Sequence, residues 1–108
     1  MGDLNVNFLK NEIGDAWDET IATASGLLKD FPECIIMPSD VALNITGNRV
    51  DHPLKDLPIE APIFDLGITS VQSLSKAIKS AGTIILNGPA GVFEMSDFAL
   101  GTIEMLNA

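Results

Sequence analysis

The chain has 108 residues, enough for one domain with a buried core, and its fifteen acidic and six basic residues give a formal net charge of −9. This charge repels nucleic acids and anionic membrane surfaces, so we expect neither as a partner. The single cysteine, Cys34, excludes an internal disulfide, and no apolar run approaches the roughly 20 residues of a membrane span, so we expect a cytoplasmic protein.

The amino-terminal segment fits two structures. Leu4, Val6 and Phe8 alternate with polar residues, as in a half-exposed strand. Leu4, Phe8 and Leu9 also fit one face of a short helix. The pattern alone leaves both open.

The first predicted helix covers residues 15–31. Its apolar residues recur at helical spacing, Asp15 is the predicted N-cap, and Pro32 ends the helix. The apolar run at 34–37 follows directly. We expect this run to be a buried strand.

A hairpin is predicted next, with strands at 41–45 and 49–50. Gly47 and Asn48 between them predict a type II′ turn. A proline-punctuated linker then leads to a short strand at 63–65.

A second helix is expected to begin at Thr69, where a capping box with Gln72 is predicted, and to end at Gly82. Residues 83–86 form the third predicted buried strand, and Ser96 is predicted to cap a last helix. The expected core positions of this last helix are Ala99, Ile103 and Leu106.

Strands that alternate with helices indicate a parallel sheet with right-handed crossovers. The predicted fold class is α/β, a three-layer Rossmann-like partial parallel sheet with a β-hairpin insertion. No repeat, low-complexity tract or linker divides the chain, so we expect residues 1–108 to form a single unit.

Residues 83–94 are the most informative segment, because an apolar run leads into two glycines and a proline and ends on an acid. Open α/β sheets bind their ligands at the carboxyl ends of buried strands. The glycines let a ligand approach the main chain, and Glu94 offers two acceptor oxygens suited to the vicinal hydroxyls of a ribose. The same residues also fit an ordinary tight turn, so the pattern alone leaves a structural role open.

Residues 87–94, with the sequence Asn-Gly-Pro-Ala-Gly-Val-Phe-Glu, resemble the nucleotide-loop signature of phosphoglycerate kinase. Residues 36–40 resemble that family's Leu-Pro-x-Asp segment, and residues 64–69 its Asp-x-Gly-x-x-Thr segment. Residues 98–104 resemble the helix that follows the loop, and the short central linker is most similar to archaeal members. The family has a helix in the amino-terminal region, so the resemblance favours a helix there.

The resemblance implies a fragment from the middle of the carboxyl-terminal nucleotide-binding domain of this glycolytic kinase, which would occupy residues 1–108. The full enzyme transfers a phosphoryl group between 1,3-bisphosphoglycerate and ADP, and uses ADP or ATP with Mg²⁺. Glu94 would bind the ribose hydroxyls, with Phe64 and Val92 near the adenine. The implied nucleotide-binding residues are Phe64, Asn87, Gly88, Pro89, Gly91, Val92 and Glu94. The residues implied to be structural are Asp40, Asp65, Gly67 and Thr69.

The chain also departs from the family. One arginine and one histidine cannot form the family's basic substrate patch, and the family's Gly-Gly-Ala-Lys and Gly-Gly-x-Asp-Thr segments are absent. All six basic residues lie outside the glycine loop, residues 87–94, in sequence. We therefore expect the nucleoside half of a site, with no catalytic residue, no metal ligand and no activity in this chain alone.

Two alternatives remain open at this point, namely a stand-alone nucleotide-binding or interaction module and a structural acidic domain whose loop is only a turn. A fragment of a larger sheet would also expose strand edges and helix faces. We therefore expect self-association, first through Leu4, Phe8 and Leu9, and more strongly as salt screens the charge.

Overall fold

The protein is represented by a computed structural model that describes residues 10–108, so the predicted amino-terminal face of Leu4, Phe8 and Leu9 lies outside the described residues. The chain divides into two compact units, Met1–Met37 and Pro38–Ala108.

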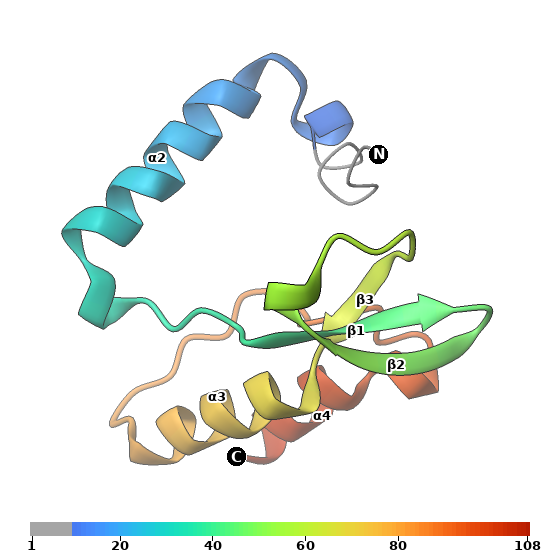
Figure 1. The fold of residues 1–108 in the computed structure, drawn as a ribbon. Coiled ribbons are helices and arrows are strands. Elements are labelled where there is room, and N and C mark those ends of the chain that lie inside the picture. The colour runs from blue at the N-terminus through green and yellow to red at the C-terminus, as the bar shows by residue number, and fades with distance from the viewer. Residues whose placement is uncertain (1–9) are drawn as a thin grey trace. The chain divides into compact units, whose positions relative to one another are not determined.

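The first unit contains the helix α2 (Trp17–Asp30), which confirms the first predicted helix (Figure 1). Asp15 lies in the short 3₁₀ turn η1 (Gly14–Ala16) that precedes it, and the N-cap of α2 makes no side-chain hydrogen bond. The prediction of Asp15 as the cap is therefore wrong. None of the residues of α2 is buried.

The second unit holds the sheet and two further helices (Figure 1). Its main elements are β1 (Asp40–Ile45), β2 (Asn48–Pro53), β3 (Ile63–Leu66), α3 (Ile68–Ser80) and α4 (Leu100–Asn107).

The sheet has three strands in the order β2-β1-β3, and both pairings are antiparallel. Val41, for example, lies opposite His52 of β2 and Leu66 of β3. The central strand β1 is covered on both faces, because the four consecutive residues from Asp40 to Leu43 are all buried. The mixed α/β class is thus confirmed, whereas the described strands form an antiparallel sheet and do not confirm the expected parallel one.

The hairpin between β1 and β2 is confirmed, but its turn is centred one residue earlier than predicted. Ile45 pairs with Asn48, and the two residues between them, Thr46 and Gly47, have φ angles of 52° and 89°. Two positive φ values are typical of a type I′ turn, so the type II′ prediction is wrong. The Asn44 side chain stabilises this turn by accepting a hydrogen bond from the Gly47 amide at 2.8 Å.

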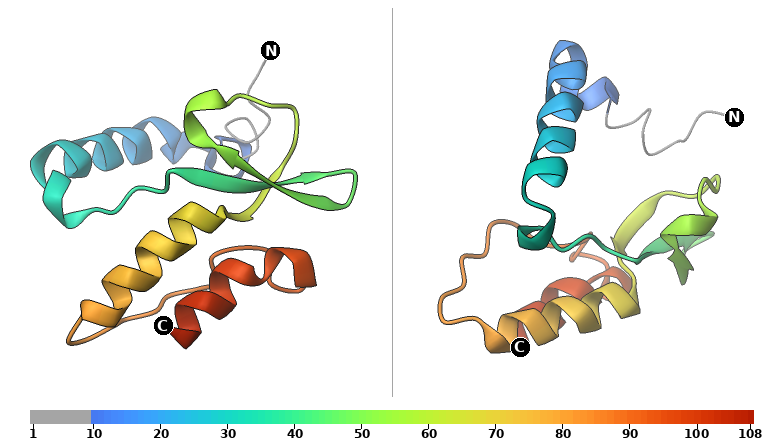
Figure 2. Two further views of the ribbon diagram at one scale, coloured as in Figure 1. Left: turned by 60° about the horizontal axis from the view of Figure 1, so that its bottom comes forward. Right: turned by 60° about the vertical axis from the view of Figure 1, so that its left-hand side comes forward.

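Helices α3 and α4 lie side by side on the same side of the sheet, which gives this unit two layers where three were predicted (Figure 2). The core includes Val71 of α3 and the fully buried Phe98, which precedes α4. On the other face of β1, Val41 and Leu43 pack with residues of the segment that connects β2 to β3.

Two predicted strands, at 34–37 and 83–86, do not form in the structure: Cys34 ends the 3₁₀ turn η2 (Pro32–Cys34), and the other residues of both runs are irregular. Ile85 is 91% exposed, and the three-stranded sheet of the described residues offers no partner strand beside it. A strand requires a hydrogen-bonding neighbour, so apolar β-type sequence alone does not produce one. These two predictions are wrong for the described residues.

The last predicted helix is confirmed only in part. Ser96 begins the 3₁₀ turn η4 (Ser96–Phe98), and α4 follows without a side-chain cap. Ala99 is buried as predicted, but Ile103 and Leu106 are exposed, so the predicted inward face is wrong at those two positions. None of the helices in residues 10–108 is long and apolar enough to cross a membrane.

Candidate functional site

A hollow of about 330 Å³ lies between strand β3 and the glycine loop. The hollow is lined by four of the residues predicted to bind nucleotide. Two of these have large apolar side chains, and the other two are a proline and a glycine of the glycine loop. These four are Phe64, Pro89, Gly91 and Val92. The remaining lining residues are Val41, Ile63, Asp65, Leu66 and Ala90.

Backbone hydrogen bonds hold the glycine loop against the sheet. The Val92 amide donates to the Phe64 carbonyl at 2.8 Å, which attaches the loop to β3. The Ala90 amide donates to the Thr102 hydroxyl oxygen at 3.0 Å, which attaches it to α4. The loop is therefore fixed on both sides of Gly91.

The two glycines of the loop serve different purposes. Gly88 has a φ of 79°, a conformation that side chains disfavour. Gly91 instead permits close packing, because a Cβ atom there would lie 2.6 Å from both the Asp65 Oδ1 atom and the Phe64 carbonyl oxygen. The sequence predicted that the loop glycines let a ligand approach the main chain. In the structure, the group that packs closely against Gly91 is strand β3.

Glu94, the predicted ribose ligand, lies in a tight turn beside the hollow and does not line it. The Met95 amide closes this turn by donating to the Val92 carbonyl at 3.0 Å. The Glu94 residue is exposed, as are Asn87 and Gly88, which also do not line the hollow. Three of the seven predicted residues are thus outside the hollow.

Phe64 is partly buried and packs edge-to-face against Phe98, with ring centroids 5.1 Å apart and an interplanar angle of 75°. Aromatic rings favour this arrangement. Because Phe98 is fully buried, it fixes the ring that forms one wall of the hollow.

An ion pair that sequence reasoning missed lies directly behind the loop. The Arg49 Nη1 atom lies 2.9 Å from the Asp65 Oδ2 atom, and the Asp65 side chain has no exposed surface. Arg49 also donates to the Leu66 carbonyl at 2.8 Å and to the Asp97 carbonyl at 3.0 Å. The one signal in the sequence was a lone arginine within a strongly acidic chain.

Arg49 also pairs with Asp51, at 3.0 Å from Nη2 to Oδ1. Burial acts to lower the pKa of Arg49, but hydrogen bonds and charges of Asp51 and Asp65 outweigh it and raise the pKa above its ordinary value. The guanidinium is therefore permanently charged, and its donors are occupied by protein acceptors. The fold thus places a cation beside the glycine loop, although this cation is distant from the loop in sequence. Because Arg49 is paired with Asp51 and Asp65, it is not free to bind a phosphate group.

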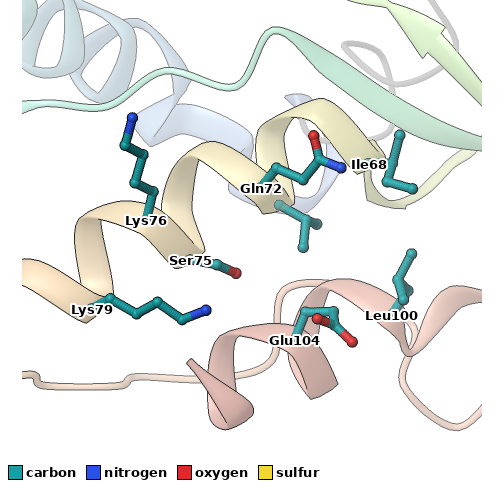
Figure 3. A pocket seen from close by; sticks show the side chains of 8 residues that line it. Ile68, Gln72, Ser75, Lys76, Lys79, Leu100 and Glu104 are labelled. Atoms are coloured by element: carbon teal, nitrogen blue, oxygen red, sulfur yellow. The ribbon is translucent and has the colours of Figure 1, made fainter.

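A larger groove of about 520 Å³ lies between α3 and α4, and it contains none of the predicted nucleotide-binding residues (Figure 3). Ser75 and Lys79 of α3 extend toward α4, whereas Lys76 points away from it (Figure 3). The Ser75 hydroxyl oxygen is buried and makes no hydrogen bond within the described part of the chain. The glycine loop forms no part of this groove, so the smaller hollow beside β3 is the candidate nucleotide site.

The described residues contain no cluster of three or more His, Cys, Asp or Glu side chains placed to bind a metal ion. Magnesium in kinases is usually held by substrate phosphates and one or two carboxylates. A Mg²⁺ ion that accompanies the nucleotide would therefore be held mainly by its phosphates, with at most one or two carboxylates from this part of the chain.

Comparison with known proteins identifies the relatives of this chain. The phosphoglycerate kinase from Methanothermobacter thermautotrophicus is 42% identical over 108 residues, which are 100% of this chain and 25% of the relative. That from Natronomonas pharaonis is 48% identical over 88 residues, which are 81% of this chain and 22% of the relative. The crystal structure of phosphoglycerate kinase from Pyrococcus horikoshii OT3 matches with a TM-score of 0.83 and 30% identity, covering 97% of this chain and 26% of that chain.

The chain thus spans about a quarter of the length of these relatives. The sequence profile of the phosphoglycerate kinase family matches residues 2–108, which include the glycine loop and all seven predicted nucleotide-binding residues. The resemblance seen in the loop therefore extends over nearly the whole sequence, and the chain belongs to the phosphoglycerate kinase family.

Proposed function

We propose that residues 1–108 are part of the nucleotide-binding domain of a phosphoglycerate kinase and bind the nucleoside end of ADP or ATP. The observation that carries this proposal is the hollow beside β3, where Phe64, Pro89, Gly91 and Val92 meet. These residues come from two segments more than twenty residues apart, so their convergence is a property of the fold.

Each part of the site has a proposed task. The partly buried side chains of Phe64 and Val92 form apolar walls for the adenine ring. The backbone around Pro89 and Gly91 borders the ribose and the first phosphate. Glu94, exposed on the adjacent turn, accepts hydrogen bonds from the ribose hydroxyls.

The test of this function is a titration of the chain with ADP. A hydrogen bond to a charged acceptor contributes about 1.5–3 kcal/mol, so Glu94→Ala should weaken ADP binding about tenfold or more. Glu60→Ala is the matched control, because Glu60 is an exposed acid outside the loop, and it should leave the Kd unchanged. Equal binding of ADP and 2′,3′-dideoxy-ADP by the wild-type chain would show that Glu94 does not bind the ribose.

Catalysis in the whole enzyme would transfer a phosphoryl group between 1,3-bisphosphoglycerate and ADP, and this requires cationic groups around the transferred phosphate. The donors of Arg49 are engaged with Asp51, Asp65 and backbone carbonyls. We therefore expect no turnover by this chain alone in a coupled kinase assay. Activity that co-purifies with the protein peak would contradict this expectation.

We further propose that the apolar runs at 34–37 and 83–86 become strands of a parallel sheet when further strands are available to them. The exposure of Met37, at 59%, and of Ile85, at 91%, supports this reading. The isolated chain should then self-associate, and more strongly at high salt, because salt screens its charge of −9. Light scattering should detect oligomers at millimolar protein, and a monomer at both low and high salt would contradict the proposal.

A further inference from the structure

The carboxylate of Asp65 connects three segments that are distant in sequence. Its Oδ2 atom accepts hydrogen bonds from Arg49 Nη1 of β2 and from the Gly101 amide of α4, both at 2.9 Å. Its Oδ1 atom accepts one from the Leu66 amide of β3 at 2.8 Å. All of these contacts are buried or partly buried, so the carboxylate has a single fixed position.

The glycine loop packs against the same carboxylate. A Cβ atom at Gly91 would lie 2.6 Å from Asp65 Oδ1, and one at Gly101 would overlap the same atom. The segment from Gly91 to Gly101 therefore touches Asp65 at both of its ends. Glu94 lies within this segment and is itself exposed.

Arg49 adds a third attachment to this segment. The same Nη1 atom that binds Asp65 also donates to the Asp97 carbonyl at 3.0 Å, between Glu94 and Gly101. Its second acidic partner, Asp51, is 35% exposed and accepts hydrogen bonds from Arg49 and from the Ile68 amide, both outside the glycine loop, so that ion pair can be removed separately.

We infer that Asp65 and Arg49 are positioning residues for the nucleotide site, which hold the segment from Gly91 to Gly101 so that Glu94 faces the ribose. This inference rests on the proposed function. A purely structural ion pair would stabilise the fold, and its loss would weaken all ligands equally. A positioning pair would in addition determine how well the site distinguishes ribose from its dideoxy analogue.

The experiment compares the wild-type chain with Asp65→Asn and Arg49→Lys, and uses Asp51→Asn as the matched control. An amide has one acceptor oxygen, so Asp65→Asn cannot satisfy the three donors that Asp65 binds. Arg49→Lys keeps the charge but loses the forked donors that reach Asp65, Leu66 and Asp97 together. Arg49→Lys is the milder substitution, so it still tests the inference if Asp65→Asn does not fold.

The first readout is the ratio of Kd for 2′,3′-dideoxy-ADP to Kd for ADP. We expect about tenfold or more in the wild-type chain and in Asp51→Asn, as for one charge-assisted hydrogen bond. We expect a ratio near one in Asp65→Asn and Arg49→Lys, with circular dichroism spectra unchanged. Variants that fold and retain the wild-type ratio would overturn the inference.

The second readout needs no ligand and separates this inference from the proposed function. Amide hydrogen exchange of Ala90 and Val92 should accelerate about tenfold in Arg49→Lys relative to the amides of β1, because the loop loses its support. If the wild-type chain shows no preference for ribose, the proposed contact between Glu94 and the ribose fails, and the exchange rates alone decide whether the pair positions the loop. Unchanged exchange at both amides would overturn the inference in that case too.

Discussion

Replacing Asp40 with alanine is expected to lower the free energy of unfolding by about 3 kcal/mol, because it leaves buried donors without an acceptor. The Asp40 carboxylate accepts hydrogen bonds from the Thr69 amide at 3.0 Å and from the Ser70 amide at 2.7 Å. The Ser70 hydroxyl donates to it as well, at 2.6 Å. Asp40 in β1 thus caps α3 from 29 residues away.

Chemical denaturation of wild type and Asp40→Ala measures this difference. Asp56→Ala is the matched control, because Asp56 is an exposed aspartate in the same unit, and it should change the stability by no more than about 0.5 kcal/mol. Equal losses in both variants would show that the cap contributes nothing specific.

The same carboxylate predicts a pH dependence. Burial acts to raise the pKa of Asp40, but the hydrogen bonds from Ser70 and Thr69 outweigh it and lower the pKa below its ordinary value. The stabilisation is therefore complete above the unfolded-state pKa of about 4 and is lost as pH falls through the lower folded-state value. As the pH falls through this range, the free energy of unfolding of Asp40→Asn should decrease less than that of the wild-type chain.

Gly91→Ala is expected to cost about 3 kcal/mol of stability, at the upper end of the range for overpacked sites. The added methyl would meet the Asp65 carboxylate and the Phe64 carbonyl oxygen, each at 2.6 Å. Neither atom can yield, since the carboxylate is held by Arg49 and the carbonyl belongs to β3. The loop would have to lift away and lose the hydrogen bond from the Val92 amide.

Denaturation and ADP titration of the same variant measure this effect, and we expect both stability and binding to fall. Gly82→Ala is the matched control, because a Cβ atom at Gly82 meets nothing within 4 Å. That substitution should be neutral or stabilising by up to about 1 kcal/mol. If Gly91→Ala behaves like Gly82→Ala, the close packing of the loop on β3 has no energetic importance.

The predictions that were confirmed rest on local patterns. Helical spacing of apolar residues identified α2 and α3, and a glycine between two β-type runs identified the hairpin. The caps were predicted from the nearest polar residue and were wrong at Asp15 and Thr69. For α3 the acceptor is Asp40, and no local pattern connects a residue of β1 to a helix that begins nearly thirty positions later.

The sequence by itself determined the family of this protein, the position of the glycine loop and most of its helices, because these depend on a contiguous motif or on short-range periodicity. Only the tertiary structure decided which apolar runs became strands, since pairing requires a neighbour as well as propensity. It also decided that Arg49 lies against Asp65 behind the loop. An ion pair between residues 16 positions apart forms only when the whole sheet brings the two charges together.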